Sequence, residues 1–175
     1  MIAQTLAIFF LNIRWLFTKM DNLKKILEVL NDLIRINKDR EEGYTKASRE
    51  LTPAEHNLRS AFERKAQESR NNIVQLEQLA DEVHHQLNDE QSSETQPSLS
   101  GQIYKLWSEV KNFFTGKDRS TVLKSCADGE GKAKDCYESV LNEVELPDKI
   151  HHVLDEQKNS IDASQQEMIQ MISSE

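Results

Sequence analysis

The chain has 175 residues, a length that predicts one domain with a single hydrophobic core. Charged residues make up 30% of it, with five glycines and three prolines, a composition typical of all-α proteins. The net charge of -8 argues against nucleic-acid backbones and anionic membrane surfaces as partners, because both require a clustered basic face. Neutral, cationic or metallic partners are expected.

The first twenty residues are apolar but interrupted by Asn12 and Arg14. The run is shorter than the roughly 20 residues of a spanning helix, and its charges follow the apolar stretch, whereas those of a signal peptide precede it. Met20 stands directly before "DNLKKILEVLNDL", whose first two residues can each cap a fresh helix. We interpret residues 1–20 as an extension, from an upstream start or dispensable, ahead of a domain at 21–175; an anchor or uncleaved signal is the alternative.

The next two segments repeat apolar residues every three or four positions, the pattern of a helix with one buried face. The first spans about 22–50. Its apolar stripe consists of Leu23, Ile26, Leu27, Leu30, Leu33, Ile34, Tyr44 and Leu51. Thr52, Pro53 and Glu55 then form a capping box, which predicts that a second helix covers 53–88.

A polar stretch without helical period, "NDEQSSETQPSLSG", follows and is interpreted as a linker. Residues 102–115 predict a short amphipathic crossover helix, and Asp118 and Pro147 open two further long helices, at 118–144 and 147–173. Two helical hairpins joined by about 30 residues have the connectivity of a bundle with one long crossover. The predicted fold is an all-α four-helix bundle whose crossover carries a short extra helix.

Several carboxyl and carboxamide side chains fall among the apolar positions of these helices. Each helical residue advances about 100°, and by that count Glu41 lies about 30° from the stripe centre of the first helix, whereas Glu42 lies about 130° away. Glu130 and Gln157 fall inside the stripes of the third and fourth helices, and Glu68 lies about 80° off its stripe, at the edge. We expect Glu41, Glu130 and Gln157 to share one interior, with Glu68 at its margin.

Four stretches, "LNDLIRINKDREEGY", "AFERKAQES", "VLKSCADGEGKAKDCY" and "LPDKIHHVLDEQ", together resemble the bacterial ferritin-like four-helix-bundle proteins catalogued as a domain of unknown function. The resemblance covers about residues 29–172. It implies a ferritin-like fold with inward acidic residues where di-iron relatives hold metal, and it brings no established activity. The polar positions of that family fall on Glu41, Glu68, Glu130 and Gln157.

A di-iron carboxylate centre takes a glutamate from each of two helices and a Glu-x-x-His from each of the other two. Here Glu68 is followed three residues later by Asn71, and Gln157 by Ser160, so both imidazoles are missing. The sequence therefore argues against a complete oxidase or ferroxidase centre, and no catalytic residue is assigned. The cluster is either a polar layer that fixes helix register, with Tyr44 among its donors, or a site for iron, manganese or another divalent cation.

Two weaker signals complete the pattern. His84-His85 and His151-His152 stand at helix ends that the long crossover brings together, so they form a second candidate transition-metal site. Gly129 and Gly131, on either side of Glu130, either allow close packing or mark a break in the third helix.

The two cysteines, Cys126 and Cys136, are ten residues apart on one predicted helix, about 15 Å, which is too far for a disulfide. Nothing therefore requires an oxidising compartment. We expect a cytoplasmic protein without a membrane span, and a homo-oligomer or interaction scaffold formed through outer helix faces is a third interpretation of its role.

Overall fold

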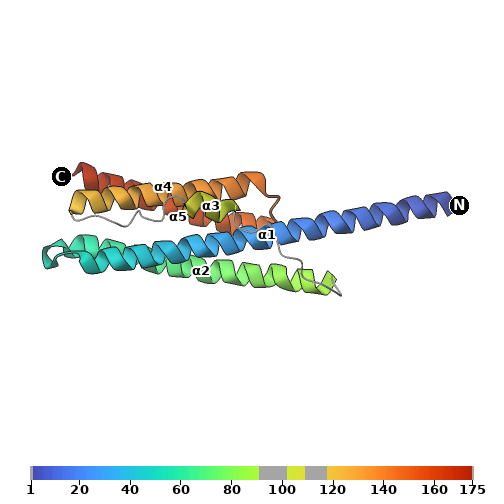
Figure 1. Ribbon diagram of the computed structural model, residues 1–175, viewed down its shortest axis with the longest axis horizontal. Helices are drawn as coiled ribbons and strands as arrows, with labels where there is room; N and C mark the ends of the chain where they lie inside the picture. Colours follow the sequence, from blue (N-terminus) through green and yellow to red (C-terminus); the bar gives the residue numbers. More distant parts are fainter. Residues whose placement is uncertain (1, 91–101, 109–117, 175) are drawn as a thin grey trace.

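The computed structural model describes residues 2–90, 102–108 and 118–174, and the regular elements among them are all helical, which confirms the all-α prediction. The elements are α1 (Ile2–Glu50), the 3-10 turn η1 (Pro53–Glu55), α2 (His56–Glu90), α3 (Gln102–Ser108), α4 (Arg119–Glu143) and α5 (Asp148–Ser173). Two antiparallel pairs, α1 with α2 and α4 with α5, lie side by side as a helical bundle (Figure 1).

The connection between the two pairs crosses the bundle from end to end. Helix α2 finishes at the end from which the N-terminal part of α1 projects, and α4 begins at the opposite end (Figure 1). The predicted crossover helix exists as α3, which packs against both α1 and α4. The rest of the predicted 102–115 helix, and most of the predicted linker, lie outside the described residues.

Helix α1 differs from the prediction of a helix start at residue 22, because it is continuous from Ile2. The side chain of Asn22 does not cap a helix; its amide donates a 2.9 Å hydrogen bond to the carbonyl oxygen of Glu145, in the turn between α4 and α5. No proline or glycine interrupts the preceding sequence, so the backbone has no reason to stop there. No helix of the described residues combines the length and apolar character needed to cross a membrane.

The capping signals in the sequence are found at the expected helix starts. The Glu55 carboxylate accepts hydrogen bonds from the backbone N–H and the hydroxyl of Thr52, at 3.0 and 2.8 Å. Pro53 occupies the first position of the turn that leads into α2. Asp118 caps α4 by accepting from the backbone N–H of Thr121 at 3.0 Å.

The core consists of two apolar clusters with a polar layer between them. The cluster nearer the α1–α2 turn contains Tyr44, Ala47, Leu51, Leu58, Phe62, Ala66, Leu123, Cys126, Ala127 and Met168. The larger cluster fills the other end of the bundle around Leu30, Leu33, Leu76, Val140 and Leu154. The buried polar side chains that separate the two clusters come from all four long helices and include Asn37, Arg40, Asn72, Glu130 and Gln157. The candidate site is this layer.

Candidate functional site: a buried polar layer

An arginine and a glutamate with no solvent exposure form the centre of the polar layer. Arg40 on α1 donates from Nη2 to both carboxylate oxygens of Glu130 on α4, at 3.0 and 2.8 Å, and from Nε to Oε1 at 3.1 Å. Burial alone would lower the pKa of Arg40, but the charge and hydrogen bond of Glu130, together with Tyr44 and Glu68, outweigh it and the pKa is raised, so the guanidinium keeps its charge. The pair therefore links the two helical hairpins through a charge-assisted, multiply hydrogen-bonded contact.

Tyr44 completes the surroundings of the Glu130 carboxylate. Its hydroxyl donates to Oε1 of Glu130 at 2.7 Å, from one turn beyond Arg40 on the same helix. Burial raises the pKa of Tyr44 well above its ordinary value, and the Glu130 carboxylate raises it further. The phenol consequently stays protonated and remains a donor.

A second set of contacts extends the layer toward α5. Arg40 Nη1 donates to Oδ1 of Asn37 at 2.8 Å, and the Asn37 amide donates to the hydroxyl of Tyr137 at 2.8 Å. Tyr137 in turn donates to Oε1 of Gln157 at 2.7 Å, and the Gln157 amide donates to Oε1 of Gln75 on α2 at 2.8 Å. A chain of side-chain hydrogen bonds thus passes through all four long helices.

The structure confirms the interior positions of Glu130 and Gln157 and the marginal position of Glu68. The Glu68 side chain on α2 is 22% exposed. Its Oε1 lies 3.6 Å from Nη2 of Arg40, which is an ionic contact and too long for a hydrogen bond. This oxygen accepts no hydrogen bond from the described residues. Its Oε2 lies 3.8 Å from Nζ of Lys65.

The prediction that Glu41 faces the interior is wrong. Its side chain is 31% exposed and accepts a 2.9 Å hydrogen bond from Arg70 at the bundle surface. The error comes from averaging the stripe over the whole helix, because a seam that repeats every 3.5 residues drifts by about 20° per heptad around a helix with 3.6 residues per turn. Near the C-terminal end of α1 this drift has moved the buried face from Glu41 to Arg40.

As placed, the four predicted residues do not fit a di-metal centre. Gln157 is hydrogen-bonded to Tyr137, which lies seven residues, or about 10 Å, along α4 from Glu130. The Arg40 guanidinium lies between Glu130 and Glu68 and contacts both carboxylates. A metal cation there would have to displace a buried positive charge. Within the part of the chain that the structure describes, no group of three or more His, Cys, Asp or Glu side chains is arranged to hold a metal ion.

Sequence reasoning missed Arg40 because it counted only apolar residues as members of the stripe. A signal for it was present: Leu33, Asn37, Arg40, Tyr44, Ala47 and Leu51 continue one series of three- and four-residue steps. A polar residue that keeps the phase of such a series is a candidate for the interior.

The weaker signals have separate outcomes. All four histidines of the two pairs are exposed, and His152 lies 3.5 Å from Glu156 on its own helix. Helix α4 continues through both glycines, so neither marks a break. A Cβ added at Gly131 would overlap with Nε2 of Gln165, which supports close packing between α4 and α5 at that position.

Fold and interior together define the class of protein: an all-α helical bundle whose core is divided by a buried, ion-paired polar layer. Residues 25–143 match the model of a family described as "Domain of unknown function (DUF2383)". Because the match covers more than half of the chain, this protein belongs to that family. No curated protein matches the chain.

Proposed function

We propose that this protein is a ferritin-like helical bundle with a binding or structural role, and that its acidic centre has become a structural ion pair. The connectivity supports the ferritin-like assignment, since α2 and α4 run parallel and are joined by a crossover that spans the bundle (Figure 1). A bundle of this kind acts through its outer faces, because its centre is filled by its own side chains.

The single observation that carries this proposal is the position of Arg40. Its guanidinium places a permanent positive charge against Glu130, where a metal-binding relative would place its cation. Both carboxylate oxygens of Glu130 are already occupied by hydrogen bonds from Arg40 or Tyr44. The arrangement satisfies the buried charges without a cofactor, as a layer that fixes register requires.

The competing proposal is a di-metal redox or metal-storage protein that binds iron, manganese or another divalent cation at the acidic centre around Glu130, with Glu68 at its margin. Metal analysis of the full chain purified without chelator separates the two. Our proposal predicts no stoichiometric metal in the wild-type protein and none in Glu130→Gln. Stoichiometric metal that is lost in Glu130→Gln, with helical circular dichroism unchanged, would establish the competing function. Glu42→Gln, the same substitution at an exposed glutamate on α1, is the matched control.

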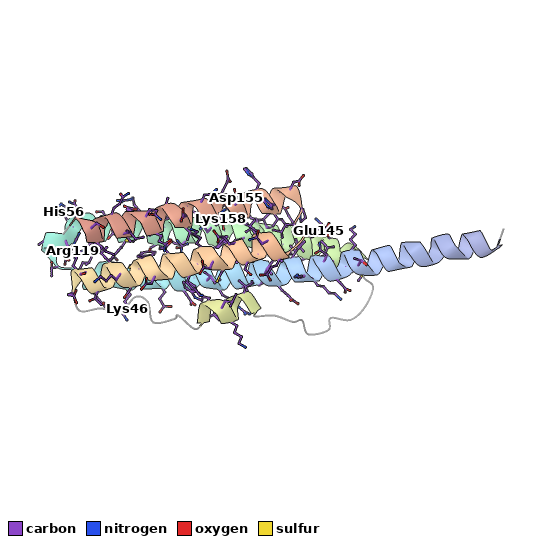
Figure 2. All side chains as sticks on the ribbon, turned by 90° about the horizontal axis from the view of Figure 1, so that it is seen from above. Lys46, His56, Arg119, Glu145, Asp155 and Lys158 are labelled. Carbon is purple, nitrogen blue, oxygen red and sulfur yellow. The ribbon has the colours of Figure 1, made fainter. Side chains whose placement is uncertain are left out.

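A third proposal, an interaction scaffold, is favoured by the shape of α1. The N-terminal part of this helix projects well beyond the ends of its neighbours (Figures 1 and 2). Mass in solution over a range of protein concentrations, compared between the full chain and a variant lacking residues 2–19, tests it. Self-association that disappears in the shorter variant would support a scaffold built on this segment, and equal masses would count against it.

A further inference from the structure

Helix α3 is a short element on the outside of the bundle, packed against α1 and α4 (Figure 2). It has only seven residues, fewer than the roughly 12–15 that an isolated helix needs for stability in water. Its conformation therefore depends on the surface that it covers. We call this surface the α3 seat and define it by Asp32, Arg35 and Asp39 on α1 and Cys136 on α4.

The contacts in the α3 seat are specific. Trp107 is 1% exposed and its indole N–H donates to Oδ2 of Asp39 at 2.8 Å. The hydroxyl of Tyr104 donates to the same oxygen at 3.2 Å, and its backbone N–H donates to Oδ2 of Asp32 at 3.3 Å. The Arg35 guanidinium lies 5.6 Å from the centre of the Tyr104 ring. A helix is thus recognised through an aromatic anchor and through donors aimed at two carboxylates.

Release of α3 differs physically from separation of the polar layer. The seat carboxylates, Asp32 and Asp39, would face water on release, where a charged group is well solvated. Separation of Arg40 from Glu130 would leave the Glu130 carboxylate inside the bundle without a cation, and Arg40 with only its longer 3.6 Å contact to Glu68. The α3 contacts can therefore open without leaving a buried charge unpaired, whereas the core contacts cannot.

We propose that the α3 seat is a docking site for an amphipathic helix and that α3 is its resident occupant within the chain. The competing occupant is a neutral or basic helix of another protein that carries an isoleucine and a tryptophan four residues apart, as Ile103 and Trp107 are in α3. Charge complementarity sets this chemistry, because the sequence of α3 has one lysine and no acidic residue, and the seat has two carboxylates against the single guanidinium of Arg35. An acidic helix would bring its charge against Asp39.

The reactivity of the Cys136 thiol shows whether α3 covers the seat. Its Sγ lies 3.9 Å from the backbone oxygen of Ile103, and burial raises the pKa of its thiol to about 12. Cys126 is on the same helix but belongs to the other apolar cluster. Opening of the seat should expose the first thiol and leave the second buried.

The test uses the full chain in two single-thiol forms, Cys126→Ala and Cys136→Ala, each with and without Trp107→Ala. The probe is a small aromatic disulfide reagent whose reaction is followed by absorbance. We expect Trp107→Ala to accelerate labelling of Cys136 at least tenfold and to leave labelling of Cys126 unchanged. Equal acceleration of both thiols, or no acceleration of either, overturns the proposal.

A synthetic peptide tests the occupant. The peptide "SGQIYKLWSEV", residues 100–110, should slow labelling of Cys136 in the Trp107→Ala chain, and the same peptide with alanine in place of its tryptophan should not. Absence of protection by the first peptide overturns the docking site. A concentration-dependent dimer of the wild-type chain that loses its stability in Trp107→Ala would instead identify the α3 of a second copy as the occupant, and would overturn the assignment to another protein.

Discussion

A fully buried arginine is tolerated in this interior because all three of its guanidinium nitrogens donate hydrogen bonds. Nε and Nη2 of Arg40 donate to Glu130, and Nη1 donates to Asn37. The cost of removing both charges from water is large, so each must keep its partner for the native state to form. The residues that touch this pair are therefore those most sensitive to substitution.

Tyr44→Phe tests this sensitivity with a change of one oxygen atom. It removes the 2.7 Å hydrogen bond to Glu130 while leaving the ring packed near Phe62. We expect the free energy of unfolding in urea to fall by about 1–3 kcal/mol, because a buried carboxylate loses one of its donors. Glu41→Gln, at the partly exposed neighbour of Arg40, should change the free energy of unfolding by less than about 0.5 kcal/mol. Equal losses in the two variants would contradict the assignment of the interior.

The sequence predicted part of the candidate site at this scale. Helical phase correctly placed Glu130 and Gln157 inside and Glu68 at the margin, because the apolar residues around each define the local direction of the stripe. It failed for Glu41 because few apolar residues define the stripe in the second half of α1. The polar residues Asn37 and Arg40 continue the stripe there in the same phase but were not counted as members of it, and their partners on other helices show that they are interior.

At the scale of the helices, the starts of α2 and α4, marked by side-chain chemistry, were predictable, and the start of the first helix was not. Asp118 and the Thr52–Glu55 capping box satisfy backbone donors directly, so the residue types alone indicate the boundary. The predicted start of the first helix at residue 22 had cap-forming residues too. Nothing there ends the preceding helix, and a cap residue by itself does not interrupt one.

Asp118→Asn tests the contribution of one cap to the pH dependence of stability. The hydrogen bonds from the Thr121 backbone and hydroxyl hold the pKa of Asp118 below its ordinary value of 3.8. A lowered folded-state pKa gives stability that is present above the unfolded value and is lost as the pH falls through the folded value. Asparagine caps a helix equally well but does not titrate. We expect the thermal midpoint of the variant to fall less than that of wild type when the pH is lowered from 6 to 2; parallel curves would contradict this.

Gly131→Ala tests the close packing between α4 and α5. The new Cβ would displace the Gln165 amide, which donates a 3.3 Å hydrogen bond to the carbonyl oxygen of Ala127. Losing that bond costs about 0.5–1.5 kcal/mol, and alanine offsets this with about 1 kcal/mol of helix propensity. We expect a net change within about 1 kcal/mol in urea unfolding. A loss above about 3 kcal/mol would mean that the backbones themselves must move apart.

At the scale of the whole molecule, the all-α bundle and its two hairpins followed from apolar periodicity and loop position alone. The polar layer between two apolar clusters did not, because it depends on which residues of different helices meet at the same height. That relation is set by the lengths of the turns and the tilt of the helices, which a single sequence does not encode locally. A buried layer of this kind favours one register over those that would pair a charge with an apolar side chain.

Deletion of residues 2–19 tests whether the bundle is independent of the projecting part of α1. Among the side chains of α1 that the structure describes, the first buried in the larger cluster is Leu23. Asn22 and Lys25 donate hydrogen bonds to the backbone carbonyls of Glu145 and Glu143 at the α4–α5 end. We expect residues 20–175 of the shortened chain to stay as helical, by circular dichroism, as they are in the full chain. We also expect a thermal midpoint within a few degrees of that of the full chain. Cooperative unfolding at a much lower temperature would show that the projecting segment is part of the folded unit.

The ion pair between Arg40 and Glu130 is tested most directly by a double-mutant cycle with Arg40→Met and Glu130→Leu, measured as free energies of unfolding in urea. Each single variant removes the hydrogen-bonded partner of one buried charge, and only the 3.6 Å contact with Glu68 remains for Arg40, so we expect each to lose about 3–5 kcal/mol. The double variant removes both charges and should lose less than the sum of the two by at least about 1 kcal/mol. Losses that add within about 0.5 kcal/mol would show that the two side chains do not stabilise each other, and would contradict a structural ion pair at the centre of the bundle.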